Sequence, residues 1–254
     1  MVDLHCHILP GIDDGPQNLV EFIEMANTAV SEGITTVFAT PHHLNGQYEN
    51  QKEKILAYVA KCNLLLQKHE ISLKISPGQE LRIHCQLFES LESDEVLTLD
   101  NKGKYLLLEL PFSEVPIYTN DTIYELLLKG ITPIIVHPER NRELIENNDL
   151  LFELVQNGAL TQLTAGSIIG RFGKKVKSFS QKIIEHNLAH FIATDAHNTS
   201  SRRFFLQEAY DSITEQYGIG STFYFKENAE VVLLGQHPQI KQPIPIRKRI
   251  FGIF

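Results

Sequence analysis

The alternation of apolar runs with amphipathic segments constrains the fold of this chain more than any other feature. Seven short apolar runs fit buried β-strands, and most segments between them carry apolar residues at helical spacing. Strands that are apolar on both faces and separated by helices indicate a parallel sheet. The predicted strands are residues 2–8, 35–40, 73–80, 105–110, 133–137, 160–164 and 190–194.

Apolar spacing also predicts the helices between these strands. Between the first two strands, apolar residues recur at spacings of four, three and four, which is typical of one helix face, and Gly33 predicts its end. The predicted faces are Leu19, Ile23, Ala26 and Val30; Ile55, Val59, Cys62 and Leu66; Ile123, Leu126 and Leu127; Val176, Phe179 and Ile183; and Phe205, Ala209 and Ile213. Seven β-then-α units favour a closed barrel, and an open doubly wound sheet is the alternative.

Length, charge and cysteine content exclude several classes of protein. A chain of 254 residues suits one large domain or two small ones, and its net charge of −8 argues against a general nucleic-acid binder. Three cysteines without paired spacing do not suggest a disulfide framework. The first strand begins at Val2, which leaves no room for a leader peptide, and no apolar run approaches a membrane span of about 20 residues. We therefore expect a cytoplasmic protein.

Clusters of histidine and acidic residues stand at the ends of the predicted strands. Side chains alternate along a strand, so His5 and His7 share one side, as do Asp195 and His197. A carboxylate such as Glu109, inside an apolar run, is costly unless it is paired or bound to a metal. The clusters are His5-Cys-His7, Pro41-His42-His43, His137-Pro-Glu139 and Asp195-Ala-His197, with Glu80 and Glu109 ending two further strands.

Imidazole and carboxylate ligands together suit manganese, iron or zinc. More than six candidate ligands exceed the needs of one ion, so two or three ions are predicted. Ions about 3.5–4 Å apart are the usual apparatus of phosphoryl ester hydrolysis. Asp13 and Asp14 lie in a glycine-flanked loop, where acids are commonly turn residues. Cys6 faces the other side of its strand and is interpreted as a buried small residue.

Arginines flank two of these clusters. Arg140 directly follows His-Pro-Glu, and Arg202 and Arg203 follow Asp-Ala-His within a few residues. A planar guanidinium can bind two phosphate oxygens at once, so these positions favour phosphate recognition. No cysteine begins a Cys-X5-Arg loop, which excludes a cysteine-dependent phosphatase.

The motifs together resemble the polymerase and histidinol phosphatase (PHP) superfamily, and within it the manganese-dependent protein-tyrosine phosphatases of Gram-positive capsule and exopolysaccharide loci. The resemblance extends from the first residue to about residue 229. The residues that carry it are 3–15 (DLHCHILPGIDDG), 39–43 (ATPHH), 77–80 (PGQE), 135–142 (IVHPERNR) and 193–197 (ATDAH).

This resemblance implies a distorted (β/α)7 barrel of the PHP fold with three metal ions, Mn²⁺ by family, at the C-terminal rim. One ion would be held by His5, His7, Glu80 and Asp195; Glu80 would bridge to a second held by Glu109 and His137; and Asp14, His42 and His197 would hold the third. Arg140 and Arg203 resemble the phosphate-binding positions, with Arg202 beside them. The implied substrate is the phosphorylated tyrosine-rich tail of a bacterial tyrosine kinase.

Two other functions remain open at this point. The chain could be a small-molecule phosphatase of the histidinol phosphatase kind, or a docking module that keeps metal ions only for stability. We divide it into a catalytic barrel, residues 1–238, and a C-terminal tail, residues 239–254. The tail carries Lys241, Arg247, Lys248 and Arg249 with no acid, followed by Ile-Phe-Gly-Ile-Phe. It is expected either to pack on the barrel or to bind weakly to an anionic membrane surface or a membrane partner.

Overall fold

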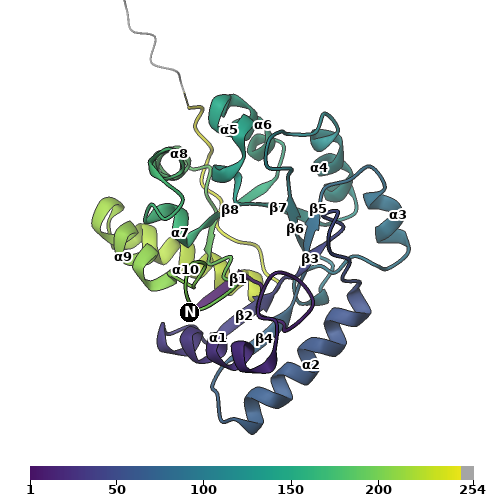
Figure 1. Cartoon of the computed structure of the whole chain (residues 1–254). Coiled ribbons are helices and arrows are strands. Elements are labelled where there is room, and N and C mark those ends of the chain that lie inside the picture. The colour runs from purple at the N-terminus through teal and green to yellow at the C-terminus, as the bar shows by residue number, and fades with distance from the viewer. Residues whose placement is uncertain (247–254) are drawn as a thin grey trace, which may run out of the picture.

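The structure, a computed structural model, describes residues 1–246, and two parallel sheets form within them. One has the strand order β1-β2-β4 and the other β3-β5-β6-β7-β8-β9. The strands lie inside a ring of helices (Figure 1). Their bounds are β1 Val2–Cys6, β2 Thr36–Ala39, β3 His42–His43, β4 Lys74–Pro77, β5 Glu80–Arg82, β6 Tyr105–Glu109, β7 Thr132–Val136, β8 Leu160–Thr164 and β9 Phe191–Ala193.

The chain passes from one sheet to the other where β2 is followed by β3 and where β4 is followed by β5. Strands β2 and β4 pair with each other, and β3 and β5, which follow them, pair again so that His42 lies beside Glu80. On the other side, an isolated parallel bridge joins Cys6 at the end of β1 to Ala196 after β9. The amide of Asp195 donates to the carbonyl of His5 at 2.8 Å. The ends of strands that are distant in sequence therefore meet at one place.

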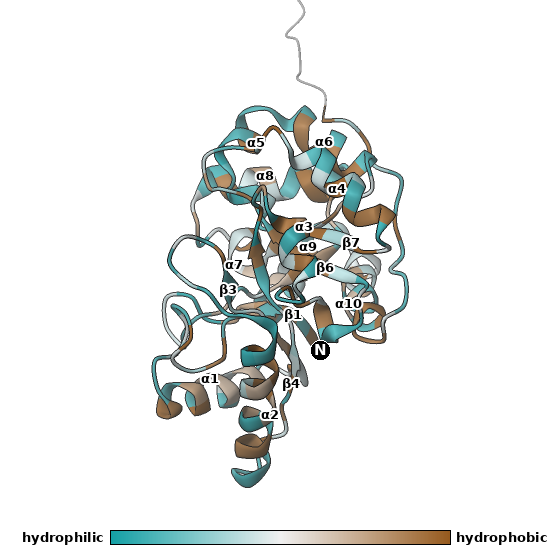
Figure 2. Ribbon diagram, turned by 90° about the vertical axis from the view of Figure 1, so that its right-hand side faces the viewer, coloured by the Kyte–Doolittle hydropathy of each residue, from teal (hydrophilic) through white to brown (hydrophobic). Residues whose placement is uncertain are grey.

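The helices surround these strands, and the amphipathic ones among them bury one face. Figure 2 shows hydrophobic and hydrophilic segments alternating along α1 and α2, as expected of amphipathic helices. The bounds are α1 Leu19–Ser31, α2 Lys52–Lys68, α3 Leu87–Glu92, α4 Thr119–Leu128, α5 Arg142–Glu146, α6 Asn148–Gln156, α7 Ala165–Ile168, α8 Lys174–Glu185, α9 Leu206–Tyr217 and α10 Ile219–Leu233, with short 3₁₀ turns η1 Leu99–Asn101 and η2 Pro138–Arg140.

The predicted parallel α/β class is confirmed, and each predicted strand overlaps an observed one. The predicted strand 35–40 corresponds to β2, and a short break separates it from β3. The predicted strand 73–80 contains a break, which divides it into β4 and the start of β5. Pro41 stands in the first break and has no amide hydrogen to donate to a strand ladder. Residues 2–8 were predicted as one strand, but β1 ends at Cys6 because the chain turns at His7 to follow Ala196.

The helix faces were predicted unevenly. Ile55, Val59, Cys62 and Leu66 are all buried along α2, as predicted. For α1 the predicted face is confirmed in part: Ala26 is buried, and Ile23 and Val30 are partly buried against the core. Leu19, however, is 54% exposed, and Phe22, Met25 and Ala29 are buried as well. This helix carries two apolar stripes, and the sequence alone does not decide which one meets the sheet. Helices α3, α5, α6, α7 and α10 were not predicted, because four are short and α10 carries apolar residues on several sides.

The first part of the predicted tail lies against the helices. The Lys241 ammonium stands 4.3 Å from the centre of the Tyr224 ring, and the Ile244 amide donates to the His186 carbonyl at 2.8 Å. Ile246 is buried. The remaining tail residues, including Arg247, Lys248 and Arg249, lie outside the described residues. Among the described helices, none is both long and apolar enough to cross a membrane.

Candidate metal centre

The structure brings all nine predicted metal ligands into one cluster at the ends of the strands. They come from β1, β3, β5 and β6 and from the loops that follow β1, β7 and β9. Donor atoms within 4.8 Å of one another form three overlapping groups. The groups are His5, His7 and Glu80; His42, Glu80 and Glu109; and His7, Asp14, His42 and His197.

The innermost group has the spacing of a metal cage. The Nε2 atoms of His5 and His7 lie 3.2 Å apart, and they lie 3.5 and 3.2 Å from one Glu80 oxygen. The same two nitrogens lie 3.6 and 3.4 Å from Asp195 Oδ1. Metal–ligand bonds of about 2.0–2.2 Å place neighbouring donors roughly 3–3.6 Å apart. These residues therefore fit a bound ion.

Glu80 occupies the centre of the cluster. Its Oε2 faces His5, His7 and the Nδ1 of His42, the last at 2.8 Å, while its Oε1 lies 2.8 Å from His137 Nε2. Glu109 completes this side, with its two oxygens 3.8 and 3.9 Å from His42 and His137. A carboxylate whose two oxygens face different groups of imidazoles has the arrangement required to bridge two ions.

The outer group faces solvent. Asp14 Oδ1 lies 3.2 Å from His197 Nε2 and 3.5 Å from His42 Nε2, and the Asp14 side chain is 41% exposed. His7 also belongs to this group by distance, although the resemblance assigned it to the first ion only. The cluster therefore runs from a buried inner half to an accessible outer half.

Buried polar atoms without hydrogen bonds support metal binding here. Glu80 Oε2, His42 Nδ1 and His197 Nε2 are buried, and their close contacts with each other and with Asp14 do not have the geometry of hydrogen bonds. Buried polar atoms usually have a partner, because leaving one unsatisfied is costly. All three atoms point into the cluster, where a metal ion would satisfy them.

Two residues that the sequence did not single out as ligands orient the inner histidines. His7 Nδ1 donates to Asp13 at 2.7 Å, and His5 Nδ1 donates to Gln162 Oε1 at 2.8 Å. Each bond leaves Nε2 facing the cluster with a free lone pair, as metal ligation requires. Asp13 was interpreted as a turn residue, but it is buried. The loop is closely packed here, since a Cβ added at Gly15 would lie 2.2 Å from the His7 carbonyl.

The backbone at two ligands adopts an uncommon conformation. His137 has φ of 38° and Asp195 has φ of 52°, in the left-handed region that residues other than glycine rarely enter. His137 directly follows β7, and Asp195 lies two residues after the end of β9. Such strain is often found at functional sites. Here the left-handed turn accompanies side chains that face the cluster.

The two glutamates differ in acidity. Burial alone would raise the pKa of Glu80, but the imidazoles of His5 and His42 hold it well below its usual value. Burial and the neighbouring charge of Glu80 instead raise the pKa of Glu109 to about 7, against the opposing effect of Arg82. Arg82 lies 2.9 Å from Glu109. The central carboxylate is therefore ionised, as bridging between ions requires.

The three flanking arginines do not point the same way. Arg140 Nη1 lies 2.8 Å from Asp195 Oδ2, and Arg202 lies 3.2 Å from both Asp14 and Asp195. Arg203 turns away: it pairs with Glu32 at 3.3 Å and with Glu208, and it stacks on the Phe205 ring. The structure thus brings Arg140 and Arg202 to the cluster, whereas the resemblance had favoured Arg140 and Arg203.

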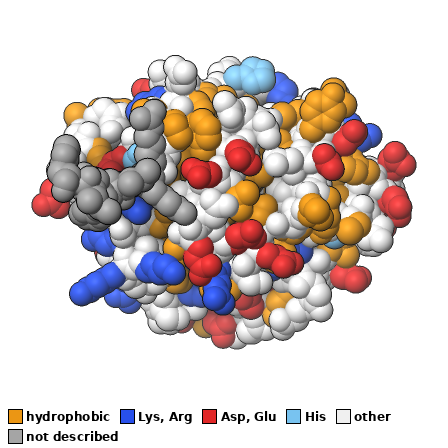
Figure 3. Space-filling model, turned by 90° about the horizontal axis from the view of Figure 1, so that it is seen from above, with side chains coloured by type: hydrophobic (Ala, Val, Ile, Leu, Met, Phe, Trp, Pro, Cys, Tyr) orange, Lys and Arg blue, Asp and Glu red, His pale blue; other side chains and the backbone are white. Residues whose placement is uncertain are grey.

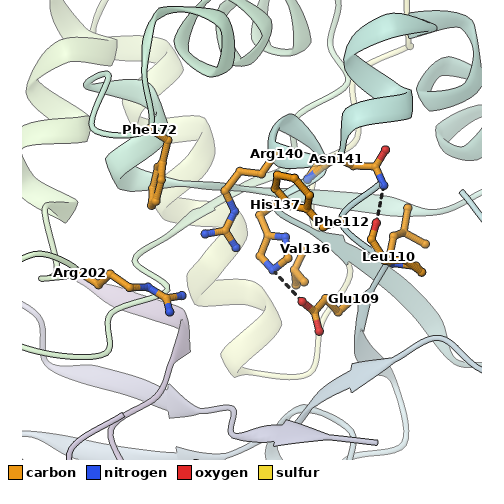
Figure 4. Close-up of a pocket in the computed structure, with 11 residues that line it drawn as sticks. Glu109, Leu110, Phe112, Val136, His137, Arg140, Asn141, Phe172 and Arg202 are labelled. Carbon is orange, nitrogen blue, oxygen red and sulfur yellow. Dashed lines mark hydrogen bonds and ion pairs between the residues drawn. The ribbon is translucent and has the colours of Figure 1, made fainter. Parts of the chain in front are cut away.

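A cavity of about 370 Å³ leads to this cluster. In Figure 4 the guanidinium groups of Arg140 and Arg202 face the same space, between Phe172 and His137. The Arg140 guanidinium lies 5.2 Å from the centre of the Phe172 ring. Phe112 lines the same cavity and is 75% exposed. The site therefore offers metal ligands, two cations and two aromatic walls.

Fold and site together define a metal-dependent hydrolase: a parallel α/β protein with imidazole and carboxylate ligands at the C-terminal ends of its strands. The chain belongs to the CpsB/CapC family of capsular polysaccharide synthesis, whose model matches residues 1–234.

Named relatives agree with this assignment. The chain is 45% identical over 255 residues to the tyrosine-protein phosphatase YwqE of Bacillus subtilis, covering all of both chains. It is 30% identical over 242 residues to the tyrosine-protein phosphatase CpsB of Streptococcus pneumoniae, covering 93% of this chain and 99% of the relative. A crystal structure from work on YwqE and CpsB, described as unique metal-dependent tyrosine phosphatases, matches with a TM-score of 0.94 and 44% identity and covers 98% of this chain and 100% of that one.

Proposed function

We propose that this protein is a metal-dependent protein-tyrosine phosphatase of capsular polysaccharide synthesis. The single observation that carries this proposal is the juxtaposition of the ligand cluster with Arg140 and Arg202 in one cavity. The family match and the names of the 45% and 30% identical relatives support it. The proposal includes Mn²⁺ as the metal, in two or three ions, with iron or zinc as alternatives.

Different residues would have different roles in hydrolysis. Ions held by His5, His7, Glu80 and the remaining ligands would supply Lewis acidity and an activated water. Arg140 and Arg202 would bind the phosphoryl oxygens and stabilise the charge that develops on them. Phe112 and Phe172 would contact the faces or edges of a phenyl ring. The phenolate leaving group, with a pKa of about 10, needs less protonation than an alkoxide.

The substrate proposal extends to a phosphorylated protein. The resemblance described above points to the tyrosine-rich tail of a bacterial tyrosine kinase that regulates polysaccharide synthesis. We also propose that residues 1–238 act as one closed (β/α)7 unit, on which the first residues of the tail 239–254 pack, and that this tail contacts a membrane surface or membrane partner. The bridge between Cys6 and Ala196 supports closure.

Metal reconstitution with a substrate panel tests the function. Chelator-stripped protein should be inactive, and Mn²⁺ should restore hydrolysis of a phosphotyrosine peptide, since empty ligands cannot activate water. Phosphoserine peptide, histidinol phosphate and single-stranded DNA should turn over far more slowly. A higher kcat/KM on histidinol phosphate would establish the small-molecule phosphatase instead. Full metal occupancy without turnover of any substrate would favour the docking module.

A further inference from the structure

A second cavity, of about 540 Å³, lies beside the candidate active site. The two cavities share Phe112, Arg140 and Phe172, so the two aromatic side chains stand between them. The other residues that line the second cavity are Arg142, Ile145, Glu146, Lys175 and Val176. Its surface is thus partly apolar and partly charged, and none of these five residues belongs to the metal cluster.

The charge of the second cavity is positive on balance. Its one acid, Glu146, is paired with Arg142 at 3.2 Å across one helical turn of α5. Lys175 makes no ion pair within residues 1–246. Lys174 and Lys177 lie beside it on α8. Within the cavity Arg140 carries a further charge, although it is paired with Asp195.

This local charge contrasts with the rest of the protein. The whole chain carries a net charge of −8. Figure 3 looks down on the end of the molecule that carries α5 and α8, and many of the basic side chains in view gather at its lower left, on the side where Figure 1 places α8. A basic surface on an acidic protein attracts an acidic partner and repels a basic one.

We propose that the second cavity binds the peptide residues next to the phosphotyrosine and selects a segment that combines acidic side chains with an apolar one. A tyrosine ring held between Phe112 and Phe172 would leave its neighbouring residues at the shared wall of the two cavities. Ile145 and Val176 would then contact the apolar side chain, and Lys175 the acidic one. This inference rests on the proposed function, because it requires a phosphotyrosine in the first cavity.

The experiment compares four phosphotyrosine peptides of equal length. Their flanking residues are acidic with one leucine, acidic with serine in place of that leucine, neutral, or basic. Each is assayed for kcat/KM at about 0.15 M salt with wild type, Lys175→Glu and Lys182→Glu. Lys182 is exposed on the same helix but does not line the cavity, so Lys182→Glu is a matched control for net charge.

Wild type and Lys182→Glu should prefer the acidic peptide over the neutral one by about two- to fivefold, the usual effect of a surface charge pair. The leucine-containing peptide should exceed its serine counterpart by a similar factor. Lys175→Glu should invert the order of acidic and basic peptides. p-Nitrophenyl phosphate, which has no flanking residues, should be hydrolysed equally by all three proteins.

Three results would overturn the inference. Equal rates for all flanks in wild type would show that the cavity binds no peptide. The same ranking in Lys175→Glu and Lys182→Glu would assign the preference to the field of the whole protein. If Lys175→Glu co-sedimented with anionic vesicles less than wild type but ranked the four peptides in the same order, Lys175 would be shown to bind a lipid surface. Failure to hydrolyse p-nitrophenyl phosphate and every phosphotyrosine peptide would instead refute the proposed function.

Discussion

The inner and outer halves of the candidate metal cluster combine similar residue types in different surroundings. In the inner half, His5, His7, Glu80 and Asp195 are buried, and Asp13 and Gln162 fix the two imidazoles. In the outer half, Asp14 is partly exposed and its oxygens are shared between His42, His197 and Arg202. The inner half is therefore preorganised, whereas the outer half is partly open to solvent.

The largest expected effect follows from the inner half. Glu80→Gln keeps the volume of the side chain but removes the charge that faces His5, His42 and His137. Activity should fall by more than the roughly 10²–10³ that one transition-state contact is worth, and bound metal should decrease. Elemental analysis and kcat/KM on a phosphopeptide measure both.

Glu49→Gln, at an exposed position, is the matched control and should behave as wild type. Asp14→Asn sharpens the comparison, because it should release metal from the outer half alone and leave part of the bound metal in place. Retention of wild-type activity and metal in Glu80→Gln would contradict the assignment of this residue as a bridge.

The next effect separates two adjacent arginines. Arg202→Ala should lower kcat/KM by about 10²–10³, because its guanidinium lies beside the cluster. Arg203→Ala should change kcat/KM only severalfold, since Arg203 is paired with Glu32 and Glu208 away from the cavity. Steady-state kinetics with a phosphotyrosine peptide checks the ratio. The reverse ratio would restore the assignment that the resemblance favoured.

The sequence made the candidate ligands recognisable because each motif is local. Alternation along a strand places His5 and His7 on one side, and an apolar run makes Glu109 conspicuous. The sequence could not predict that Gln162 orients His5, because Gln162 lies 157 residues away and contacts His5 only in the folded sheet. Nor could it choose between Arg202 and Arg203, because Glu32, from the end of α1, decides the direction of Arg203.

A similar limit applies to the fold. Strand positions followed from short apolar runs, but the buried face of α1 followed only in part, because Leu19 is exposed and Phe22 is buried in its place. The choice between them is made by packing against the sheet. Asp13 shows the same limit at the site: its residue type fits a turn, and only the folded structure reveals that it is buried against His7.

A smaller effect concerns the support of the inner half. Asp13→Asn keeps the shape of the side chain but weakens the charge-assisted bond to His7 Nδ1. Residues that orient a metal ligand typically contribute 10- to 100-fold in metal affinity or activity. The apparent Mn²⁺ affinity of stripped protein should fall by about that factor, while saturating Mn²⁺ restores part of the rate. An unchanged metal titration would mean that Asp13 acts only on the loop.

The smallest effect on activity comes from a buried histidine away from the cluster. His190 precedes β9, and its Nδ1 accepts from the Thr161 amide at 3.1 Å. Burial lowers the pKa of His190 to about 4, below the unfolded value of about 6.5. Between these two pH values the unfolded chain binds more protons than the folded protein does. The free energy of unfolding therefore rises with pH and decreases as the pH falls. The loss attributable to His190 is about 2 kcal/mol between pH 7 and pH 5.

His190→Asn keeps an acceptor for Thr161 but cannot titrate, so urea unfolding should show a pH dependence weaker by this amount, with kcat/KM at neutral pH unchanged. An identical pH dependence in variant and wild type would show that His190 is not held neutral in the folded protein, and a loss of activity would connect it to the cluster after all.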